Sequence, residues 1–183
     1  MLTDMFVFLK RFLSEPGRVG SIAPSSRFLC REIMKQVPWH TAKTIVELGP
    51  GTGVFTKAIL RNKRPDARFI AIERDAQFRE LLAKRFPSII VKNEALNLND
   101  YLEELQIAQV DAIISGLPFA VFPEELREGI LREVHQALAP EGLFITFQYS
   151  LQLHTELQQR FSKVDIGFTA LNIPPAFIYI CHK

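Results

Sequence analysis

The sequence predicts a doubly wound α/β domain built on a mostly parallel, seven-stranded sheet. Three observations lead to this prediction. Short apolar strands alternate with helical patterns from residue 44 onward, a glycine-rich loop joins the first strand to the first helix, and two strands lie close together before residue 183. Strands that alternate with helices favour a parallel sheet covered on both faces. The two late strands indicate a terminal hairpin on the same sheet.

Each element is predicted from its apolar pattern. The expected strands cover residues 44–48, 68–73, 89–91, 110–115, 143–148, 164–172 and 177–181, and the expected helices cover 54–61, 76–85, 124–138 and 151–161. The helix over 124–138 is the clearest, because its apolar residues repeat at helical spacing: Leu126, Ile130, Leu131, Val134 and Leu138. A turn is expected at 139–142, where Pro140 and Gly142 interrupt the pattern.

Residues 1–40 precede this alternation. We expect them to form an N-terminal helical extension of one domain that spans residues 1–183, with the core at 41–183. The first helix of the extension is amphipathic, since one arc carries Leu2, Met5, Phe6, Leu9, Phe12 and Leu13. Pro16 and Gly17 end this helix, and a second helix is expected to start after Ser25 or Ser26, either of which can cap it.

The composition is that of a globular protein, with 48% hydrophobic and 23% charged residues. No apolar run approaches the roughly 20 residues that a membrane-spanning helix needs, and the first residues do not form a secretory signal. Cys30 and Cys181 lack metal-ligand spacing, so no metal site is expected. Two thiols far apart in sequence suit a reducing compartment, although one disulfide stays open as an alternative.

The charge of the chain is unevenly distributed. Residues 1–36 hold six Lys/Arg and three Asp/Glu, whereas the net charge of the whole chain is only +2. A local basic bias favours contact with an anionic surface. It falls well short of the basic footprint of a dedicated nucleic-acid-binding protein, so no DNA partner is expected.

The most informative motif is the loop that follows the first strand. Gly49, Gly51 and Gly53 permit tight turns and close approach of the backbone to a ligand, and the loop opens a helix, as a nucleotide-binding loop does. A dinucleotide-binding loop reads Gly-x-Gly-x-x-Gly, but here Val54 occupies the place of its third glycine. Glu47 puts a carboxylate before the loop, which suits a cationic ligand such as a sulfonium with an amino-acid tail and disfavours a pyrophosphate.

Acidic residues at the ends of the next two strands extend this expected ligand site. Glu73 closes the second strand, 20 residues after Gly53, where a carboxylate can accept hydrogen bonds from both ribose hydroxyls. Glu94 and Ala95 follow the third strand, where a polar side chain can meet an adenine edge. The alternative for each acid is an ordinary solvated carboxylate. The expected cofactor contacts are Glu47, Gly49, Gly51, Gly53, Glu73, Arg74, Glu94, Ala95 and Ser115.

The fourth strand ends in Ile114-Ser-Gly-Leu-Pro-Phe119, at the edge of the sheet where ligands of open α/β folds bind. Backbone carbonyls in such a turn are good acceptors for an amine substrate, and an aromatic face favours a cation. The candidate catalytic residues are Gly116, Leu117, Pro118, Phe119 and Tyr149, of which Tyr149 follows the fifth strand. The alternatives are a tight turn with the Phe119 ring in the core, and Tyr149 as a surface aromatic.

These motifs make the chain similar to the bacterial phospholipid N-methyltransferases, which convert phosphatidylethanolamine stepwise toward phosphatidylcholine. The matching stretches are 20–26, 46–55, 115–119, 147–150 and 174–177, and together they span nearly the whole chain. The glycine loop identifies only the superfamily, whereas Ser-Gly-Leu-Pro-Phe and Phe-Gln-Tyr-Ser are more specific. The resemblance implies a class I, Rossmann-like methyltransferase fold, S-adenosylmethionine as cofactor and an amine head group as acceptor.

A more distant resemblance is to the ribosomal RNA adenine dimethylases, whose turn reads Asn-Leu-Pro-Tyr/Phe. Here Gly116 takes the position of the asparagine, so the side-chain amide that would grip an adenine amino group is missing. Glu94 stands where both families usually have an aspartate. The resemblance therefore disfavours RNA as the acceptor.

The resemblance to lipid-modifying enzymes and the amphipathic N-terminal helix together imply a cytoplasmic enzyme that binds the inner face of the membrane peripherally, with anionic lipid and a phospholipid head group as its partners. Methyl transfer to structured RNA or to a soluble amine, and a cofactor-binding protein without catalysis, remain open alternatives. The oligomeric state and the number of methyl groups transferred are also left open.

Overall fold

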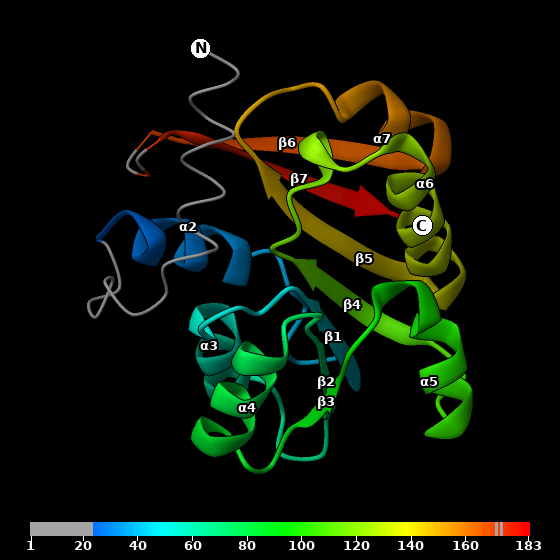
Figure 1. The fold of residues 1–183 in the computed structure, drawn as a ribbon. Helices are drawn as coiled ribbons and strands as arrows, with labels where there is room; N and C mark the ends of the chain where they lie inside the picture. Colours follow the sequence, from blue (N-terminus) through cyan, green and yellow to red (C-terminus); the bar gives the residue numbers. More distant parts are fainter. Residues whose placement is uncertain (1–23, 171, 173) are drawn as a thin grey trace.

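The structure is a computed structural model that describes residues 24–170, 172 and 174–183 (Figure 1). The amphipathic helix expected within residues 1–15, and the membrane contact assigned to it, lie outside the described residues. No helix in the described part of the chain is long and apolar enough to cross a membrane.

A seven-stranded sheet forms the centre of the molecule and confirms the predicted fold class. Its strands are β1 (Thr44–Leu48), β2 (Arg68–Ile72), β3 (Ile90–Lys92), β4 (Val110–Ser115), β5 (Leu138–Gln148), β6 (Lys163–Thr169) and β7 (Ala176–His182). They follow the order β3-β2-β1-β4-β5-β7-β6. The first five strands run parallel, while β7 is antiparallel to both β5 and β6. The predicted terminal hairpin is therefore present, and its second strand is the one that joins β5.

Helices cover both faces of this sheet. One layer holds α2 (Pro24–Met34), α3 (Val54–Asn62) and α4 (Ala76–Arg85), and the other holds α5 (Leu98–Glu104), α6 (Glu124–Ala137) and α7 (His154–Arg160) (Figure 1). The sequence pattern missed α5 and two short 3₁₀ helices, η1 (Ala95–Asn97) and η2 (Phe119–Val121). Helix α2 begins at Pro24 instead of after Ser25 or Ser26, because the first turn of a helix tolerates a proline without an N–H.

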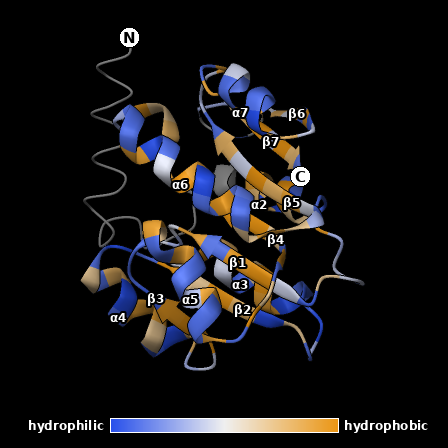
Figure 2. Cartoon of the chain, turned by 90° about the vertical axis from the view of Figure 1, so that its right-hand side faces the viewer, coloured by the Kyte–Doolittle hydropathy of each residue, from blue (hydrophilic) through white to orange (hydrophobic). Residues whose placement is uncertain are grey.

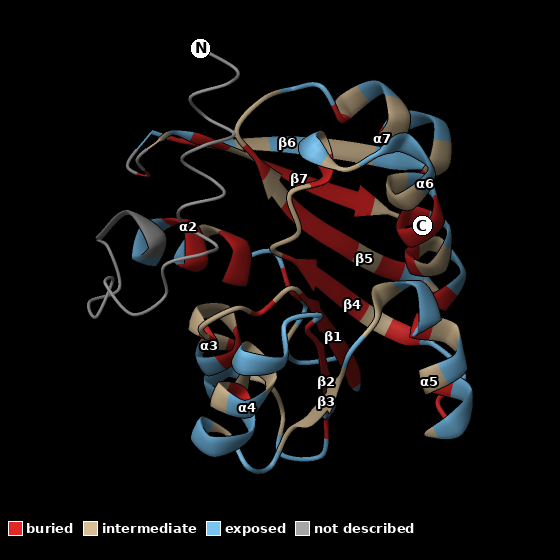
Figure 3. Ribbon diagram, in the orientation of Figure 1, coloured by how far each residue is buried: buried red, intermediate tan, exposed pale blue. Residues whose placement is uncertain are grey.

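Consecutive residues of each central strand face opposite cores. Ile45 of β1 packs in the core under α2 and α3, and its neighbour Val46 packs in the core under α5 and α6. Figure 3 shows the central strands buried and the outer sides of the helices exposed, and Figure 2 shows the same strands as the most hydrophobic elements. Because side chains alternate along a strand, Glu47 shares the face of Ile45 and enters the layer of α2 and α3.

The prediction of a turn at residues 139–142 was wrong, because these residues lie within β5. The pairing of β4 with β5 shifts register there, from Val110 opposite Leu138 to Ala112 opposite Leu143. A bulge of this kind absorbs extra residues without ending the strand, and it is one of the few places in a sheet that accepts a proline. Pro140 thus sits in an irregular strand instead of a turn.

Candidate active site

The glycine loop between β1 and α3 has a backbone that only glycine adopts readily. Gly49, Gly51 and Gly53 have φ angles of 69°, 54° and 83°, all in the left-handed region. A Cβ on Gly49 would lie 2.7 Å from Leu117 Cδ2, and one on Gly53 would lie 2.7 Å from Phe86 Cε2. Two of the three glycines therefore also let neighbouring segments pack directly against the loop.

The third glycine leaves one side of the loop open. A Cβ on Gly51 would meet nothing within 4 Å, although the backbone N–H of Gly51 donates to Glu73 Oε2 at 2.9 Å. The other carboxylate oxygen of Glu73 accepts from the N–H of Asp75 at 2.9 Å. Each oxygen keeps a further lone pair for a second donor. The carboxylate at the end of β2 is thus fixed beside the open side of the loop.

Glu47 is the least solvated carboxylate of the site. Its side chain is 1% exposed, and Thr56 of α3 donates to its Oε2 at 2.6 Å. Its Oε1 has no hydrogen-bond partner among the described residues. Burial raises the pKa of Glu47 to about 8, with a smaller contribution from the charge of Glu73. Burial and Glu47 likewise raise the pKa of Cys30, a free thiol on α2, to about 11.

The turn after β4 packs against the glycine loop through direct contacts between the two backbones. The N–H of Gly116 donates to the carbonyl of Leu48 at 2.8 Å. A Cβ on Gly116 would stand 2.9 Å from the carbonyl oxygen of Gly49, so any larger residue requires one of the two loops to move. At Gly116 this turn therefore has no room for the asparagine that the RNA dimethylase motif carries at this position.

Only one of the three carbonyls expected to face an amine is left without a donor. The Leu117 carbonyl accepts from the N–H of Phe119 at 3.0 Å and from Gln148 Nε2 at 3.0 Å. The Pro118 carbonyl accepts from the N–H of Val121 at 3.1 Å. The Gly116 carbonyl receives no hydrogen bond from any residue that the structure describes. Gly116 is thus the carbonyl of the turn that has both lone pairs available to a further donor.

Gln148, at the end of β5, was not among the predicted site residues. Its side chain is buried, and besides donating to Leu117 it accepts from the N–H of Ala120 at 3.3 Å. The amide therefore joins β5 to the turn after β4 on both sides of Pro118. The sequence did mark this position, because Gln148 lies in the Phe-Gln-Tyr-Ser segment. That segment alone does not indicate that the Gln148 side chain contacts the turn after β4.

Two predicted contacts are directed away from the site. The Phe119 ring is fully buried and makes edge-to-face contacts with Phe122 and Phe144, at centroid distances of 6.0 Å each. It cannot serve as an exposed face for a cation, because η2 turns it into the core under α6. The Ser115 hydroxyl is also fully buried and accepts from the N–H of Leu117 at 3.1 Å, so it shapes the turn.

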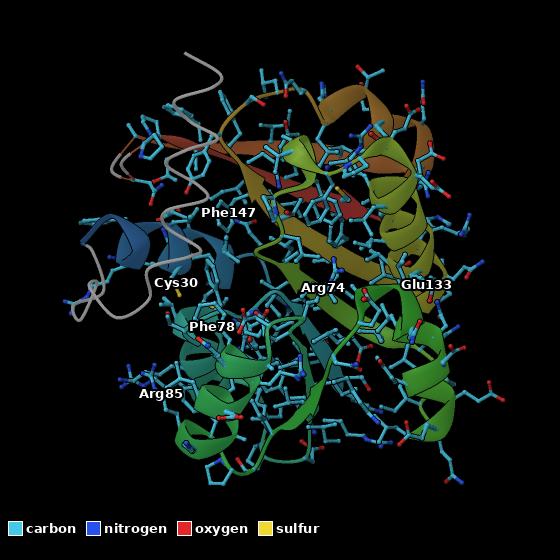
Figure 4. The ribbon with its side chains drawn as sticks, viewed as in Figure 1. Cys30, Arg74, Phe78, Arg85, Glu133 and Phe147 are labelled. Atoms are coloured by element: carbon cyan, nitrogen blue, oxygen red, sulfur yellow. The ribbon has the colours of Figure 1, made fainter. Side chains whose placement is uncertain are left out.

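Tyr149 is partly buried in an aromatic cluster. Its ring lies 6.0 Å from that of Phe147, which in turn lies 5.9 Å from that of Phe55 on α3 (Figure 4). Burial raises the pKa of the Tyr149 phenol, and a hydrogen bond with Asn172 offsets part of this increase. The phenol therefore stays protonated at neutral pH and is a hydrogen-bonding group instead of an ionised base.

The remaining expected contacts lie at the same edge of the sheet. Arg74 is exposed directly after Glu73, and its carbonyl accepts from Arg79 Nη1 at 2.6 Å (Figure 4). Glu94 and Ala95 are partly buried where η1 begins, after β3. Ligands of open α/β sheets bind at this carboxyl edge. The cofactor roles of these three residues stay predictions.

A further support of the loop was also missed by the sequence analysis. Arg85, in the last turn of α4, donates from Nη1 to the carbonyl of Thr52 at 2.6 Å. The contact fixes the loop from the side of α4, next to the contact between Gly53 and Phe86. A surface arginine in a helical pattern gives no sign of such a partner.

The donor set fits S-adenosylmethionine. Gly51 leaves the loop open, Glu73 has free lone pairs for ribose hydroxyls, and the unpartnered oxygen of Glu47 suits a cationic group. No group of three or more His, Cys, Asp or Glu side chains in the described part of the chain is placed to hold a metal ion.

Known proteins agree with this interpretation. Residues 45–142 match the family model described as a methyltransferase domain, and the chain belongs to this family. Its sheet and helices have the fold of the N-methyltransferase NodS from Bradyrhizobium japonicum bound to S-adenosyl-L-homocysteine (TM-score 0.72, 13% identity, 97% of each chain covered). They also resemble the O-methyltransferase TomG from Streptomyces achromogenes bound to S-adenosylmethionine (TM-score 0.66, 16% identity, 94% and 86% covered). The protein is a class I S-adenosylmethionine-dependent methyltransferase.

Its similarity to one curated enzyme extends over nearly the whole chain. It is 37% identical over 185 residues to the ornithine lipid N-methyltransferase of Singulisphaera acidiphila. The aligned region covers 98% of this chain and 96% of that protein. It is 29% identical over 105 residues to the ribosomal RNA small subunit methyltransferase A of Chlorobium phaeobacteroides. This shorter aligned region covers 57% of this chain and 38% of that protein. The first similarity includes the segments on both sides of the family domain.

Proposed function

We propose that this enzyme methylates the amine of a lipid head group, with ornithine lipid as the favoured acceptor. The observation that carries the proposal is the similarity to an ornithine lipid N-methyltransferase over 98% of the chain. Phosphatidylethanolamine is the second candidate acceptor, supported by the Ser-Gly-Leu-Pro-Phe and Phe-Gln-Tyr-Ser motifs. Both lipids carry a primary alkylamine, so one arrangement of acceptor groups suits either.

The residues of the turn after β4 orient this amine. S-adenosylmethionine, when bound, supplies a methyl group on a cationic sulfur, and the C–N bond forms as the C–S bond breaks and releases a neutral thioether. The Gly116 carbonyl accepts an N–H of the amine and directs its lone pair toward the cofactor side of the site. Gln148 holds the neighbouring Leu117 carbonyl, and with it the turn. Orientation of this kind supplies roughly 7–11 kcal/mol toward the barrier.

The amine must lose a proton before it attacks, because an alkylamine has a pKa of about 10.4 and is mostly protonated at pH 7. Tyr149 is protonated at neutral pH and is therefore not the acceptor of this proton. We assign the proton to solvent water, and to Gly116 the role of holding the neutral amine once it forms.

A lipid acceptor requires the enzyme to work at a membrane surface. We propose a peripheral position on the inner face of the membrane, in keeping with the basic N-terminal region. RNA as the acceptor is disfavoured, because the turn has no room at Gly116 for the asparagine of the RNA dimethylases.

The test is methyl transfer from radiolabelled S-adenosylmethionine to three acceptors in parallel: vesicles with ornithine lipid, vesicles with phosphatidylethanolamine, and total RNA. Label in ornithine lipid supports the favoured acceptor, and label in phosphatidylethanolamine alone replaces it by the second candidate. Label in RNA alone, or in none of the three by an enzyme that binds S-adenosylhomocysteine, contradicts the proposal.

A further inference from the structure

A groove of about 740 Å³ lies between α2 and α3. Its lining contains none of the residues assigned to the active site. Cys30 and Met34 of α2, Val54 and Ala58 of α3, and Trp39 give it an apolar base. The Trp39 indole is held in place, because its Nε1–H donates to the carbonyl of Met34 at 2.7 Å. Figure 4 shows Cys30 where α2 faces α3.

The rim of the groove is strongly cationic. Five basic side chains line it, and all belong to exposed residues: Arg27, Arg31, Lys35, Lys57 and Arg61. No carboxylate lines the groove. Of these five cations, only Lys35 forms an ion pair with another described residue, Glu32, at 2.7 Å. The spacing of four residues puts Arg27 and Arg31 on one side of α2, with Lys35 directly after its last turn, and puts the two cations of α3 on one side of that helix.

We propose that this groove binds the phosphate of an anionic phospholipid and so docks the enzyme on the membrane at a site separate from the acceptor. The inference rests on the proposed function, since only a lipid acceptor requires such docking. The acceptor amine itself is unsuited to the groove, because it is cationic at neutral pH and five cations repel it. A phosphate has the opposite charge, and lysine and arginine are its usual partners.

Exposed apolar side chains beside the groove favour a lipid bilayer over a soluble anion. Phe28 follows Arg27 on α2 and is 42% exposed. Strand β6 contacts α2, and it carries Ile166 and Phe168 with 39% and 60% of their surfaces exposed. In Figure 1 the far end of the β6–β7 hairpin lies beside α2. Cations next to exposed aromatic and aliphatic side chains are typical of surfaces that enter the head-group layer of a membrane.

The test uses paired neutralisations that remove the same charge. The groove variant is Lys57→Gln with Arg61→Gln, and the control is Arg132→Gln with Lys84→Gln, two exposed residues outside the groove on α6 and α4. Glutamine is a good helix former and all four side chains are exposed, so folding should be unaffected. Binding is measured by co-sedimentation with vesicles of phosphatidylcholine alone or in equimolar mixture with phosphatidylglycerol.

The groove variant should partition onto the phosphatidylglycerol vesicles roughly 30-fold less than the native chain, as the loss of two cations at an anionic surface implies. The control should change much less, and added salt should weaken the binding of the native chain. Equal losses in both variants, or no loss in the groove variant, would overturn the proposal. A loss of RNA binding with vesicle binding intact would assign the groove to nucleic acid instead.

A second readout separates this proposal from the proposed function. Methyl transfer to ornithine lipid dispersed in neutral detergent micelles should be the same for the groove variant and the native chain, because neither this lipid nor the detergent carries a phosphate. If the native chain methylates no lipid in micelles, the proposed function fails, whereas the vesicle experiment still decides whether the groove binds anionic lipid.

Discussion

Glu47 combines burial, an incomplete set of hydrogen bonds and a position beside the cofactor loop. One carboxylate oxygen is held by Thr56 and the other has no partner among the described residues. With a pKa of about 8, this side chain is mostly protonated at pH 7 in the ligand-free protein. A cationic ligand favours its ionised form, so cofactor binding near neutral pH should be coupled to proton release.

The raised pKa of Glu47 predicts a pH-dependent stability. The folded state binds this proton more tightly than the unfolded chain, whose carboxyl has an ordinary pKa of 4.5. Stability should therefore fall as pH rises from about 4.5 toward 8, as the unfolded state alone gains by ionising. Glu47→Gln removes this titration. Calorimetry of the ligand-free variant should give a melting temperature near that of the native chain at pH 5 and several degrees above it at pH 8.

The same variant should bind S-adenosylmethionine more weakly than the native chain, since glutamine offers no charge to the sulfonium. Parallel melting-temperature profiles for the two proteins between pH 5 and pH 8 would contradict the assigned pKa. Thr56→Val is a useful companion, because it removes the side-chain hydrogen bond to the carboxylate and should raise the pKa of Glu47 further.

From the contacts of Gln148 we predict that replacing this residue will reduce turnover without weakening cofactor binding. Gln148→Met keeps the length of the side chain but leaves the N–H of Ala120 and a lone pair of the Leu117 carbonyl without their partner. Losses of this type cost about 1–3 kcal/mol of stability. We expect kcat to fall more than tenfold while the affinity for S-adenosylhomocysteine changes little. An unchanged kcat would show that the turn does not depend on this amide.

At the scale of elements, the glycine loop offers a comparison between two positions with similar backbones. An alanine at Gly51 or at Gly53 must adopt the left-handed conformation, which lowers the stability of the fold by roughly 1–2 kcal/mol. Gly51→Ala adds a methyl group on the open side, whereas Gly53→Ala drives one into Phe86 of the segment after α4. Gly51→Ala should stay folded and lose cofactor affinity, and Gly53→Ala should lose several degrees more in melting temperature. Equal melting temperatures would contradict the packing described for Gly53.

The elements that the sequence predicted are those with a repeating apolar pattern. Six of the seven strands were found within three residues at each end, β5 begins five residues before its prediction, and α6 differs from its prediction by one residue at its end. Helix α5 was missed, because its Leu98 and Leu102 alone face the core within a polar stretch. The pattern also could not tell which strand of the terminal hairpin pairs with β5, since both are short and apolar.

The site was predictable to the extent that it depends on local sequence. Glu73 and the glycines follow from spacing along a strand, a loop and a helix. The amide of Gln148, the inward ring of Phe119 and the groove between α2 and α3 depend on which distant segments meet. Such contacts are set by tertiary packing, which a single sequence does not reveal.

At the scale of the whole molecule, the cofactor should act as a strong stabiliser. A ligand that binds only the folded state adds about 2.7 kcal/mol at a concentration of 100 times its Kd. For a chain of 183 residues this corresponds to an increase in melting temperature of roughly 5–10 °C. S-adenosylhomocysteine should produce this increase in the native chain, as measured by differential scanning fluorimetry.

Glu73→Ala is the matched variant for this measurement. It should remain folded, because the side chain accepts only two backbone N–H groups at the edge of the loop, yet it should lose most of the increase. A full increase in the variant would remove Glu73 from the ribose site.

The place of β7 between β5 and β6 has a consequence for biosynthesis. On the ribosome β6 emerges first, but in the finished sheet β7 is its only neighbour. Until β7 has left the exit tunnel, β6 has no strand to pair with, and β5 keeps an open hydrogen-bonding edge. Nascent chains stalled before Ala176 therefore expose an unpaired strand edge, which invites association with other chains. Of these seven strands, the one translated last thus takes an interior place in the sheet.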